Sequence, residues 1–167
     1  MTHKDLEIRE TNLGKGVFAK RPFEEGETLL PFGGKILHQK EIPEIFQPED
    51  DRYLQIGPTE YLGPSGAYDD FINHSCNPNS GVEMREHSIQ LKAIKKILLG
   101  EEITWDYSTT MDENDWEMDC QCGSKNCRKK IQDFKKLPQT TQKHYLQLGL
   151  VPEFISRTLN SGPVIRN

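Results

Sequence analysis

Residues 73–79 read Asn73-His74-Ser75-Cys76-Asn77-Pro78-Asn79, and the interpretation of the chain starts from this segment. It closes a longer stretch, from Gly63 to Ser80, that is rich in Gly, Pro, Asp, Asn and Ser and has neither a helical nor a strand period. Such a stretch predicts a long structured loop, and loops of this kind commonly carry binding and catalytic residues. We therefore expect the functional site around it.

Short alternating segments surround this loop. Apolar and polar residues alternate in Leu6–Glu10, Ile89–Ile94 and Ile103–Tyr107, with Gly and Pro between such segments. Further short strands are expected at 17–19, 28–30 and 53–57. Five or more short strands with tight connections predict a mainly β or α+β domain.

The pattern changes to helical after Cys127. Thr140 or Thr141 is expected to cap a helix that ends at Gly149, and Pro152 is expected to open a second short helix. We expect this tail to pack on the β body.

Length and composition limit the class of protein. The 167 residues fit one domain of ordinary size. Aliphatic runs such as Ile97-Leu98-Leu99 are far shorter than the roughly 20 apolar residues that a membrane span needs, and the N-terminal residues lack the apolar core of a signal peptide. An intracellular protein without membrane association is expected.

The charge is unevenly distributed. The net charge is −5, which argues against broad binding to a nucleic-acid backbone. Between Glu101 and Asp119 there are eight acidic residues and no Lys or Arg. Such a stretch is usually a solvated surface, and the alternative is attraction of a cationic partner such as a Lys-rich peptide.

The four cysteines follow the pattern Cys120-x-Cys122-x4-Cys127, with Cys76 far from the others. Three thiolates in one short loop resemble part of a zinc site, and Cys76 would complete the four ligands of a tetrahedral structural ion. Two disulfides are disfavoured because nothing indicates secretion. A third possibility is a set of small buried apolar side chains.

Four motifs together resemble the SET-domain protein lysine methyltransferases. They are Gly14-Lys15-Gly16-Val17, the segment from Asn73 to Asn79, Glu101-Glu102-Ile103-Thr104-Trp105-Asp106-Tyr107, and Cys120-x-Cys122-x4-Cys127-Arg128. The resemblance runs from about Leu6 to Ile131. It implies a SET-domain fold in which the Asn-His-Ser-Cys segment and the Tyr107 segment cross in a knot-like arrangement, which is exceptional among folds. The implied divisions are a SET domain (1–117), a zinc-binding post-SET segment (118–131) and a helical C-terminal extension (132–167).

The resemblance also implies roles for individual residues. S-adenosylmethionine would be held by Gly14, Lys15, Gly16, Asn73 and His74. The two glycines would let backbone amides approach the ligand, and the Asn-His pair offers donors and acceptors to it. Tyr107 would be the catalytic tyrosine, Tyr53 would line the same site, Trp105 would line the lysine channel, and one zinc ion would be held by Cys76, Cys120, Cys122 and Cys127.

Each feature alone has an ordinary explanation. A Gly-x-Gly is more often a turn, a lone His is more often structural, and Tyr107 could be a core aromatic because it shares a strand face with Ile103 and Trp105.

The sequence departs from the family pattern at two places. Trp105 stands where family members usually have Phe or Tyr, which leaves the number of transferred methyl groups open. Tyr68-Asp69-Asp70-Phe71-Ile72 lacks the basic residue that many histone-directed members carry there.

Three functions are compatible with these sequence features. The first is a lysine methyltransferase that acts on a lysine of a histone or other basic protein, with no sequence-specific binding of nucleic acid. The second is a catalytically silent SET-like module that binds a Lys-rich partner. The third is a zinc-stabilised interaction domain unrelated to methylation.

Overall fold

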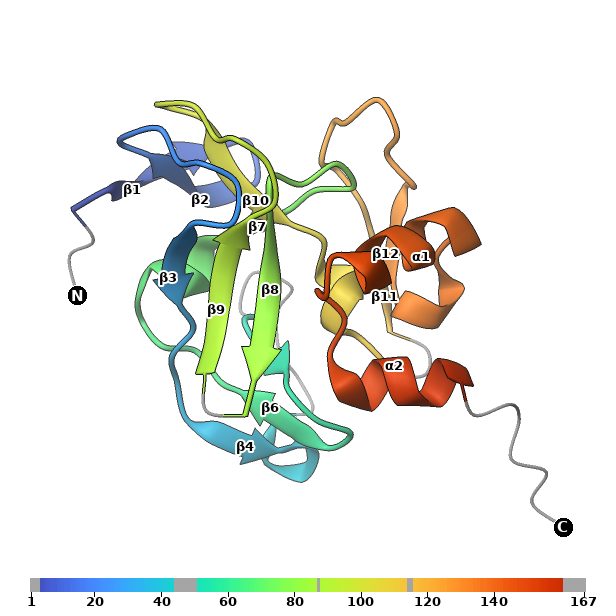
Figure 1. Cartoon of the computed structure of the whole chain (residues 1–167). Helices are drawn as coiled ribbons and strands as arrows, with labels where there is room; N and C mark the ends of the chain where they lie inside the picture. The colour runs from blue at the N-terminus through green and yellow to red at the C-terminus, as the bar shows by residue number, and fades with distance from the viewer. Residues whose placement is uncertain (1–3, 44–50, 87, 114–115, 161–167) are drawn as a thin grey trace, which may run out of the picture.

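The computed structural model describes residues 4–43, 51–86, 88–113 and 116–160. Short strands in several small sheets make up most of this part, and two α-helices follow near the C-terminus (Figure 1). The prediction of a mainly β or α+β domain is confirmed.

One sheet joins distant parts of the sequence. Its strand order is β1 (Leu6–Thr11), β2 (Gly14–Ala19), β10 (Glu102–Trp105) and β7 (Asn73–His74). β10 and β7 run parallel, and Thr104 pairs with Asn73 and Trp105 with His74. The two segments that were expected to cross therefore lie side by side.

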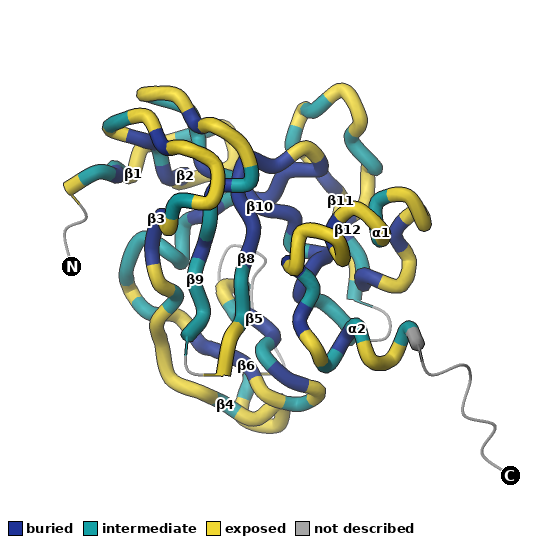
Figure 2. The backbone as a smooth tube through the Cα atoms, viewed as in Figure 1, coloured by how far each residue is buried: buried dark blue, intermediate teal, exposed yellow. Residues whose placement is uncertain are grey.

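Two three-stranded antiparallel sheets complete the β body. The first has the order β3 (Thr28–Pro31), β9 (Ser88–Ala93), β8 (Ser80–Arg85), and the second has the order β4 (Ile36–His38), β6 (Glu60–Leu62), β5 (Leu54–Gln55). The strand expected at 53–57 is shortened to the two residues of β5. The core lies between the sheets, where its most buried members include Val17, Val82, Leu91, Ile97 and Ile103 (Figure 2).

The cysteine loop lies between β11 (Glu117–Asp119) and β12 (Lys130–Gln132), which pair antiparallel. This hairpin brackets the segment 118–131, although the boundaries of the three predicted divisions stay predictions. The last seven residues of the predicted extension lie outside the described residues.

The helices begin and end close to the expected positions. α1 spans Gln139–Gln147 and follows Pro138, whose side chain makes no capping hydrogen bond, so the expected cap at Thr140 or Thr141 is wrong. Gly149 has a φ of +68° and terminates α1 as expected. α2 (Glu153–Asn160) begins directly after Pro152. No helix in the described ranges is long and apolar enough to cross a bilayer.

The helices have their own small core. It contains Phe134, Leu137, Tyr145, Leu150 and Ile155, and Ile94 of the β body packs against it. Leu150 also fills the space above Gly81 of β8, because a Cβ at Gly81 would lie 2.5 Å from Leu150 Cδ1. The extension therefore packs closely on the β body.

We expect Gly81→Ala to destabilise the protein by about 1–3 kcal/mol, because the added methyl overlaps a buried leucine that has little room to move. Chemical denaturation followed by circular dichroism measures this change. Gly33→Ala is the matched control, because a Cβ there would meet Ser65 Cβ at an ordinary 3.6 Å. An unchanged midpoint for Gly81→Ala would show that Leu150 is not tightly packed.

Candidate active site and metal centre

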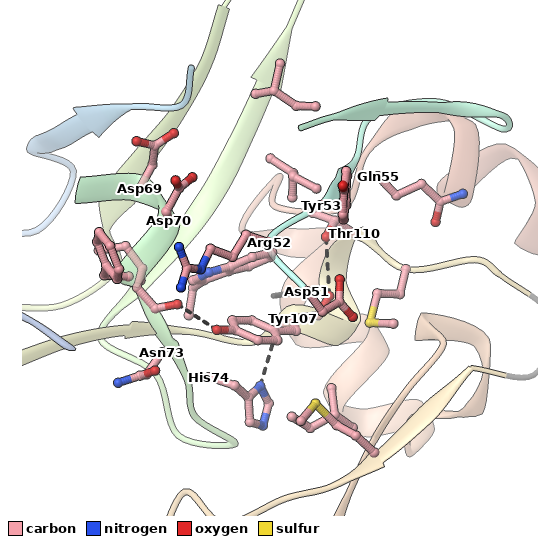
Figure 3. A pocket seen from close by; sticks show the side chains of 18 of the residues that line it. Asp51, Arg52, Tyr53, Gln55, Asp69, Asp70, Asn73, His74, Tyr107 and Thr110 are labelled. Atoms are coloured by element: carbon pink, nitrogen blue, oxygen red, sulfur yellow. Dashed lines mark hydrogen bonds between the residues drawn. The ribbon is translucent and has the colours of Figure 1, made fainter. Parts of the chain in front are cut away.

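A cavity of about 1350 Å³ lies against the first sheet. Its wall is built by the turn after β1, the segment 51–55, η3 (Tyr68–Phe71), β7 and the residues after β10 (Figure 3). Among the residues predicted for cofactor and catalysis, the cavity is lined by Gly14, Lys15, Tyr53, Asn73, His74, Trp105 and Tyr107. Gly16 is the one predicted residue of that group that does not line it.

Tyr107 does not continue the strand before it. β10 ends at Trp105, and Tyr107 begins a 3-10 turn, η4 (Tyr107–Thr110). The Asp106 carboxylate accepts a hydrogen bond from the backbone N–H of Ser108 and so caps this turn. The shared strand face expected for Ile103, Trp105 and Tyr107 is therefore wrong for Tyr107.

Tyr107 is held by two hydrogen bonds, one from its hydroxyl and one from its backbone N–H. Its hydroxyl donates to the carbonyl of Ile72 at 2.7 Å, and its backbone N–H donates to Nδ1 of His74 at 3.2 Å. Its ring centroid lies 4.9 Å from that of Trp105. Burial raises the pKa of the phenol well above its usual range, and the negative charges of Asp51 and Glu102 add to this shift. The phenol is therefore neutral, and its oxygen can accept a hydrogen bond from a group in the cavity.

Asn73 ties three strands together. Its Nδ2 donates to the carbonyl of Lys15 at 3.1 Å and to Oε1 of Glu102 at 2.7 Å. A Cβ at Gly16 would lie 2.5 Å from that same Glu102 oxygen, and Gly14 has a φ of +90°. Packing at Gly16 and a turn at Gly14 are each sufficient reason for a glycine at these positions. The role of the two glycines toward a cofactor stays a prediction.

Acidic side chains that sequence reasoning missed also line the cavity. Burial, and then the nearby charge of Glu113, raise the pKa of Asp51 to about 6. Tyr61 hydrogen-bonds to Glu113, whose pKa burial also raises. No motif marks these residues, and Glu113 had a signal only as part of the acidic stretch 101–119.

Two cations lie at the ring of Phe71. Nζ of Lys15 is 5.4 Å from the ring centroid, and the guanidinium carbon of Arg52 is 4.9 Å from it. The segment Tyr68–Ile72 lacks a basic residue, and Arg52 supplies one at Phe71 from another part of the chain. Sequence reasoning missed Arg52 because this neighbourhood arises only on folding.

Three of the four cysteines form one group with His74. The Sγ atoms of Cys76, Cys120 and Cys122 and a ring nitrogen of His74 all lie within 4.8 Å of one another. The Cys76 and Cys120 sulfurs are 3.7 Å apart, which matches the edge of about 3.8 Å expected for a tetrahedron with Zn–S bonds of about 2.3 Å. The three sulfurs therefore fit part of a tetrahedral zinc site, which needs one further ligand.

Cys127, the fourth predicted ligand, lies beside this group without belonging to it. Its Sγ is 3.8 Å from the carbonyl oxygen of Cys120 and accepts from the backbone N–H of Lys129 at 3.4 Å. Its role as a ligand stays a prediction.

The protonation state of His74 distinguishes the two candidates for the fourth zinc ligand, Cys127 and His74. Burial lowers the pKa of His74 to about 4, so its imidazole is neutral. Since the Tyr107 N–H occupies Nδ1, the ring proton is on Nε2, which lies 3.4 Å from Cys76 Sγ. In this form His74 is a hydrogen-bond donor to the Cys76 sulfur and has no lone pair for a metal.

The Cys122 thiol is prepared to ionise. Burial opposes ionisation, but the Cys76 N–H and the Ser124 hydroxyl outweigh it and lower the pKa of Cys122 to about 6. A thiolate is the form of cysteine that binds a metal.

The raised pKa of Asp51 gives a prediction for stability against pH. Below the unfolded pKa near 3.8 the residue is protonated in both states, and above pH 6 it is charged in both, so its charge penalises the folded state as pH rises from about 4 to 6. A rise in pKa of about 2 corresponds to about 3 kcal/mol. Asp51→Asn should therefore raise the melting temperature by about 6–12 °C at pH 7.5 and have little effect at pH 3.5. Glu25→Gln, at an exposed position outside this cavity, is the control. An equal gain at both pH values would contradict the burial of Asp51.

Comparisons with known proteins identify the family. The profile of the SET domain matches residues 14–108. The variant-silencing SET domain-containing protein of Plasmodium falciparum is 38% identical over 141 residues, covering 74% of this chain and 6% of that protein. The probable histone-lysine N-methyltransferase set-23 of Caenorhabditis briggsae is 31% identical over 144 residues, covering 75% of this chain and 60% of that protein. The chain thus spans less than two thirds of these relatives.

Solved structures with the same fold include two of KRYPTONITE. One, in complex with mCHG DNA and SAH, has a TM-score of 0.61 and 25% identity and covers 76% of this chain and 29% of that one. The other, with mCHH DNA, an H3(1-15) peptide and SAH, has a TM-score of 0.62 and 23% identity, with the same coverage. The SET-domain fold is confirmed. Because the profile also covers more than half of the residues, the chain belongs to the SET domain family.

Proposed function

We propose that this chain is an S-adenosylmethionine-dependent protein-lysine N-methyltransferase with one structural zinc ion. The observation that carries the proposal is the cavity in which the neutral phenol of Tyr107 lies beside Asn73 and His74. Relatives named as histone-lysine N-methyltransferases, and fold neighbours that hold SAH, support it.

The cavity fits a cofactor together with a lysine side chain. Its volume of about 1350 Å³ exceeds that of pockets for single drug-sized ligands, which are roughly 300–1,000 Å³. Gly14, Lys15, Gly16, Asn73 and His74 would hold S-adenosylmethionine, which supplies an electrophilic methyl group on a sulfonium. The cations of Lys15 and Arg52, which both lie at the Phe71 ring, would attract an anionic group of the cofactor such as its carboxylate.

The residues around Tyr107 prepare the attacking amine. A lysine has a pKa of about 10.4, so the site must favour its neutral form. Trp105, Tyr53 and the Tyr107 ring offer an apolar surrounding that lowers the pKa of an amine. The Tyr107 oxygen, with its own proton donated to Ile72, would accept a hydrogen bond from the amine and orient its lone pair. Alignment in this narrow space would supply most of the rate.

The substrate we propose is a lysine in a basic protein or peptide, with histones as the first candidate. Asp51 and Glu113 in the cavity attract a cationic side chain. One KRYPTONITE structure contains a histone H3 peptide, and both contain DNA. The absence of sequence-specific nucleic-acid binding by this chain therefore stays a prediction. Histone substrates would place the protein in the nucleus.

Transfer of labelled methyl from S-adenosylmethionine tests the activity. We expect labelling of core histones or of a discrete band in a lysate, and Tyr107→Phe should lower the rate by about 100-fold or more because the amine loses its orienting acceptor. SAH binding by calorimetry is measured in parallel and should be retained in Tyr107→Phe. Wild-type protein that binds SAH but labels nothing would favour the silent module. Protein that binds no SAH would contradict the proposal.

Metal content tests the zinc site and its ligands. Purified protein should contain one zinc per chain, and chelation should lower the melting temperature because the metal joins Cys76 to the loop after β11. Cys127→Ser should lose zinc, whereas His74→Gln should retain it. The opposite pair of results would assign the site to three cysteines and His74.

A further inference from the structure

Segments outside the SET profile reach the candidate active site through one buried carboxylate, that of Asp106. We propose that Arg128 and Tyr145 are positioning residues for methyl transfer, because they hold this carboxylate and thereby the turn that presents Tyr107. The inference rests on the proposed function and adds a role for the cysteine loop and for α1.

Asp106 accepts hydrogen bonds from its own turn and from two distant segments of the chain. Its side chain is fully buried. Oδ1 accepts from Nη2 of Arg128 at 2.7 Å and from the backbone N–H of Ser108 at 3.2 Å, and Oδ2 accepts from the hydroxyl of Tyr145 at 3.0 Å. A buried carboxylate needs such partners, so its orientation is determined by them.

The orientation of this carboxylate controls the backbone of Tyr107. Its bond to Ser108 N–H closes the cap of η4, and the backbone N–H and hydroxyl of Thr109 both donate to the Asp106 carbonyl. In this conformation the Tyr107 N–H donates to His74, and the Tyr107 hydroxyl donates to the carbonyl of Ile72. Rotation of the Asp106 side chain would open the cap and release both contacts.

Arg128 connects this turn to the cysteine group. Its backbone N–H donates to Cys76 Sγ at 3.4 Å, while its guanidinium bonds to Asp106. Its Nε is buried and is the side-chain atom left without a hydrogen-bond partner among the described residues. The guanidinium thus keeps its bond to Asp106 although its own Nε is left without a partner, which costs free energy. This is consistent with a position of Arg128 that is set by Asp106.

Tyr145 connects the turn to the helical extension. Burial raises the pKa of its phenol far above the usual range, and the negative charge of Asp106 adds to this, so the hydroxyl remains a donor. Its ring packs with Leu137, Leu150 and Ile155, which fix α1. Ring and hydroxyl thus have separate roles, and Tyr145→Phe removes only the second.

The test compares Tyr145→Phe with Ile155→Val in the full chain. Ile155 lies in the same cluster, and its aliphatic side chain cannot donate a hydrogen bond to Asp106, so its variant loses packing alone. Both are assayed well below their melting temperatures, in single turnovers at saturating cofactor and histone peptide. We expect Tyr145→Phe to slow methyl transfer about tenfold, as for one hydrogen bond to a charged group, with SAH affinity unchanged. Ile155→Val should keep the wild-type rate.

A double-mutant cycle tests the pathway. Tyr145→Phe combined with Asp106→Asn should be no slower than Asp106→Asn alone, because both changes act through one carboxylate. A wild-type rate for Tyr145→Phe, an equal loss in Ile155→Val, or losses that multiply in the double variant would each overturn the inference.

Amide hydrogen exchange supplies a readout that needs no activity. The Tyr107 and Ser108 amides should exchange about tenfold faster in Tyr145→Phe and at the wild-type rate in Ile155→Val, because only the first opens the cap. If the wild-type protein transfers no methyl group, the proposed function fails while this measurement still decides whether Tyr145 holds the turn. Unchanged exchange at both amides would overturn the inference.

Discussion

The buried charge of Asp106 is the constraint on which the rest of the site depends. A carboxylate without contact to water is stable only when its oxygens are paired, and removal of one partner from such an ion pair commonly costs about 3–5 kcal/mol. Here the partners come from the residue after the last cysteine and from α1. In the folded protein, the burial of the turn that carries Tyr107 therefore depends on Arg128 from the cysteine loop and on Tyr145 from α1.

This dependence explains the close packing of the extension. Leu150 fills the space that the missing side chain of Gly81 leaves, and Ile94 of the β body joins the small core of the helices. These apolar contacts fix α1, and α1 delivers one hydroxyl to Asp106. A segment outside the SET profile thus contributes to the geometry of the cavity.

The sequence predicted what local pattern and motif order can encode. Alternation located the strands around the loop, and the resemblance brought the Asn73 and Tyr107 segments together, which the parallel pairing of β7 and β10 agrees with. Gly149 and Pro152 marked the end of one helix and the start of the next, because the backbone preferences of these residues act locally.

The sequence could not reveal interactions that form only between distant segments. Tyr107 leaves its strand because a side chain caps the following turn, and nothing in the alternation of Ile103, Trp105 and Tyr107 signals this. Arg52 meets Phe71, and Tyr61 meets Glu113, only after folding. The reason for Gly16 was also hidden, since the atoms that exclude a Cβ there belong to Glu102, Thr11 and Asn73.

The Asn-His pair shows how these contacts limit the cofactor proposal. A neutral imidazole has one donor and one acceptor, and those of His74 are engaged by Cys76 Sγ and the Tyr107 N–H. Both amide hydrogens of Asn73 are likewise directed to Lys15 and Glu102. The side-chain donors of Asn73 and His74 are therefore occupied by contacts within the protein. A cofactor bound beside them would use the Asn73 amide oxygen and backbone groups. The pair would then bind it in an orientation that is set by the contacts of His74 with Cys76 and Tyr107 and by those of Asn73 with Lys15 and Glu102.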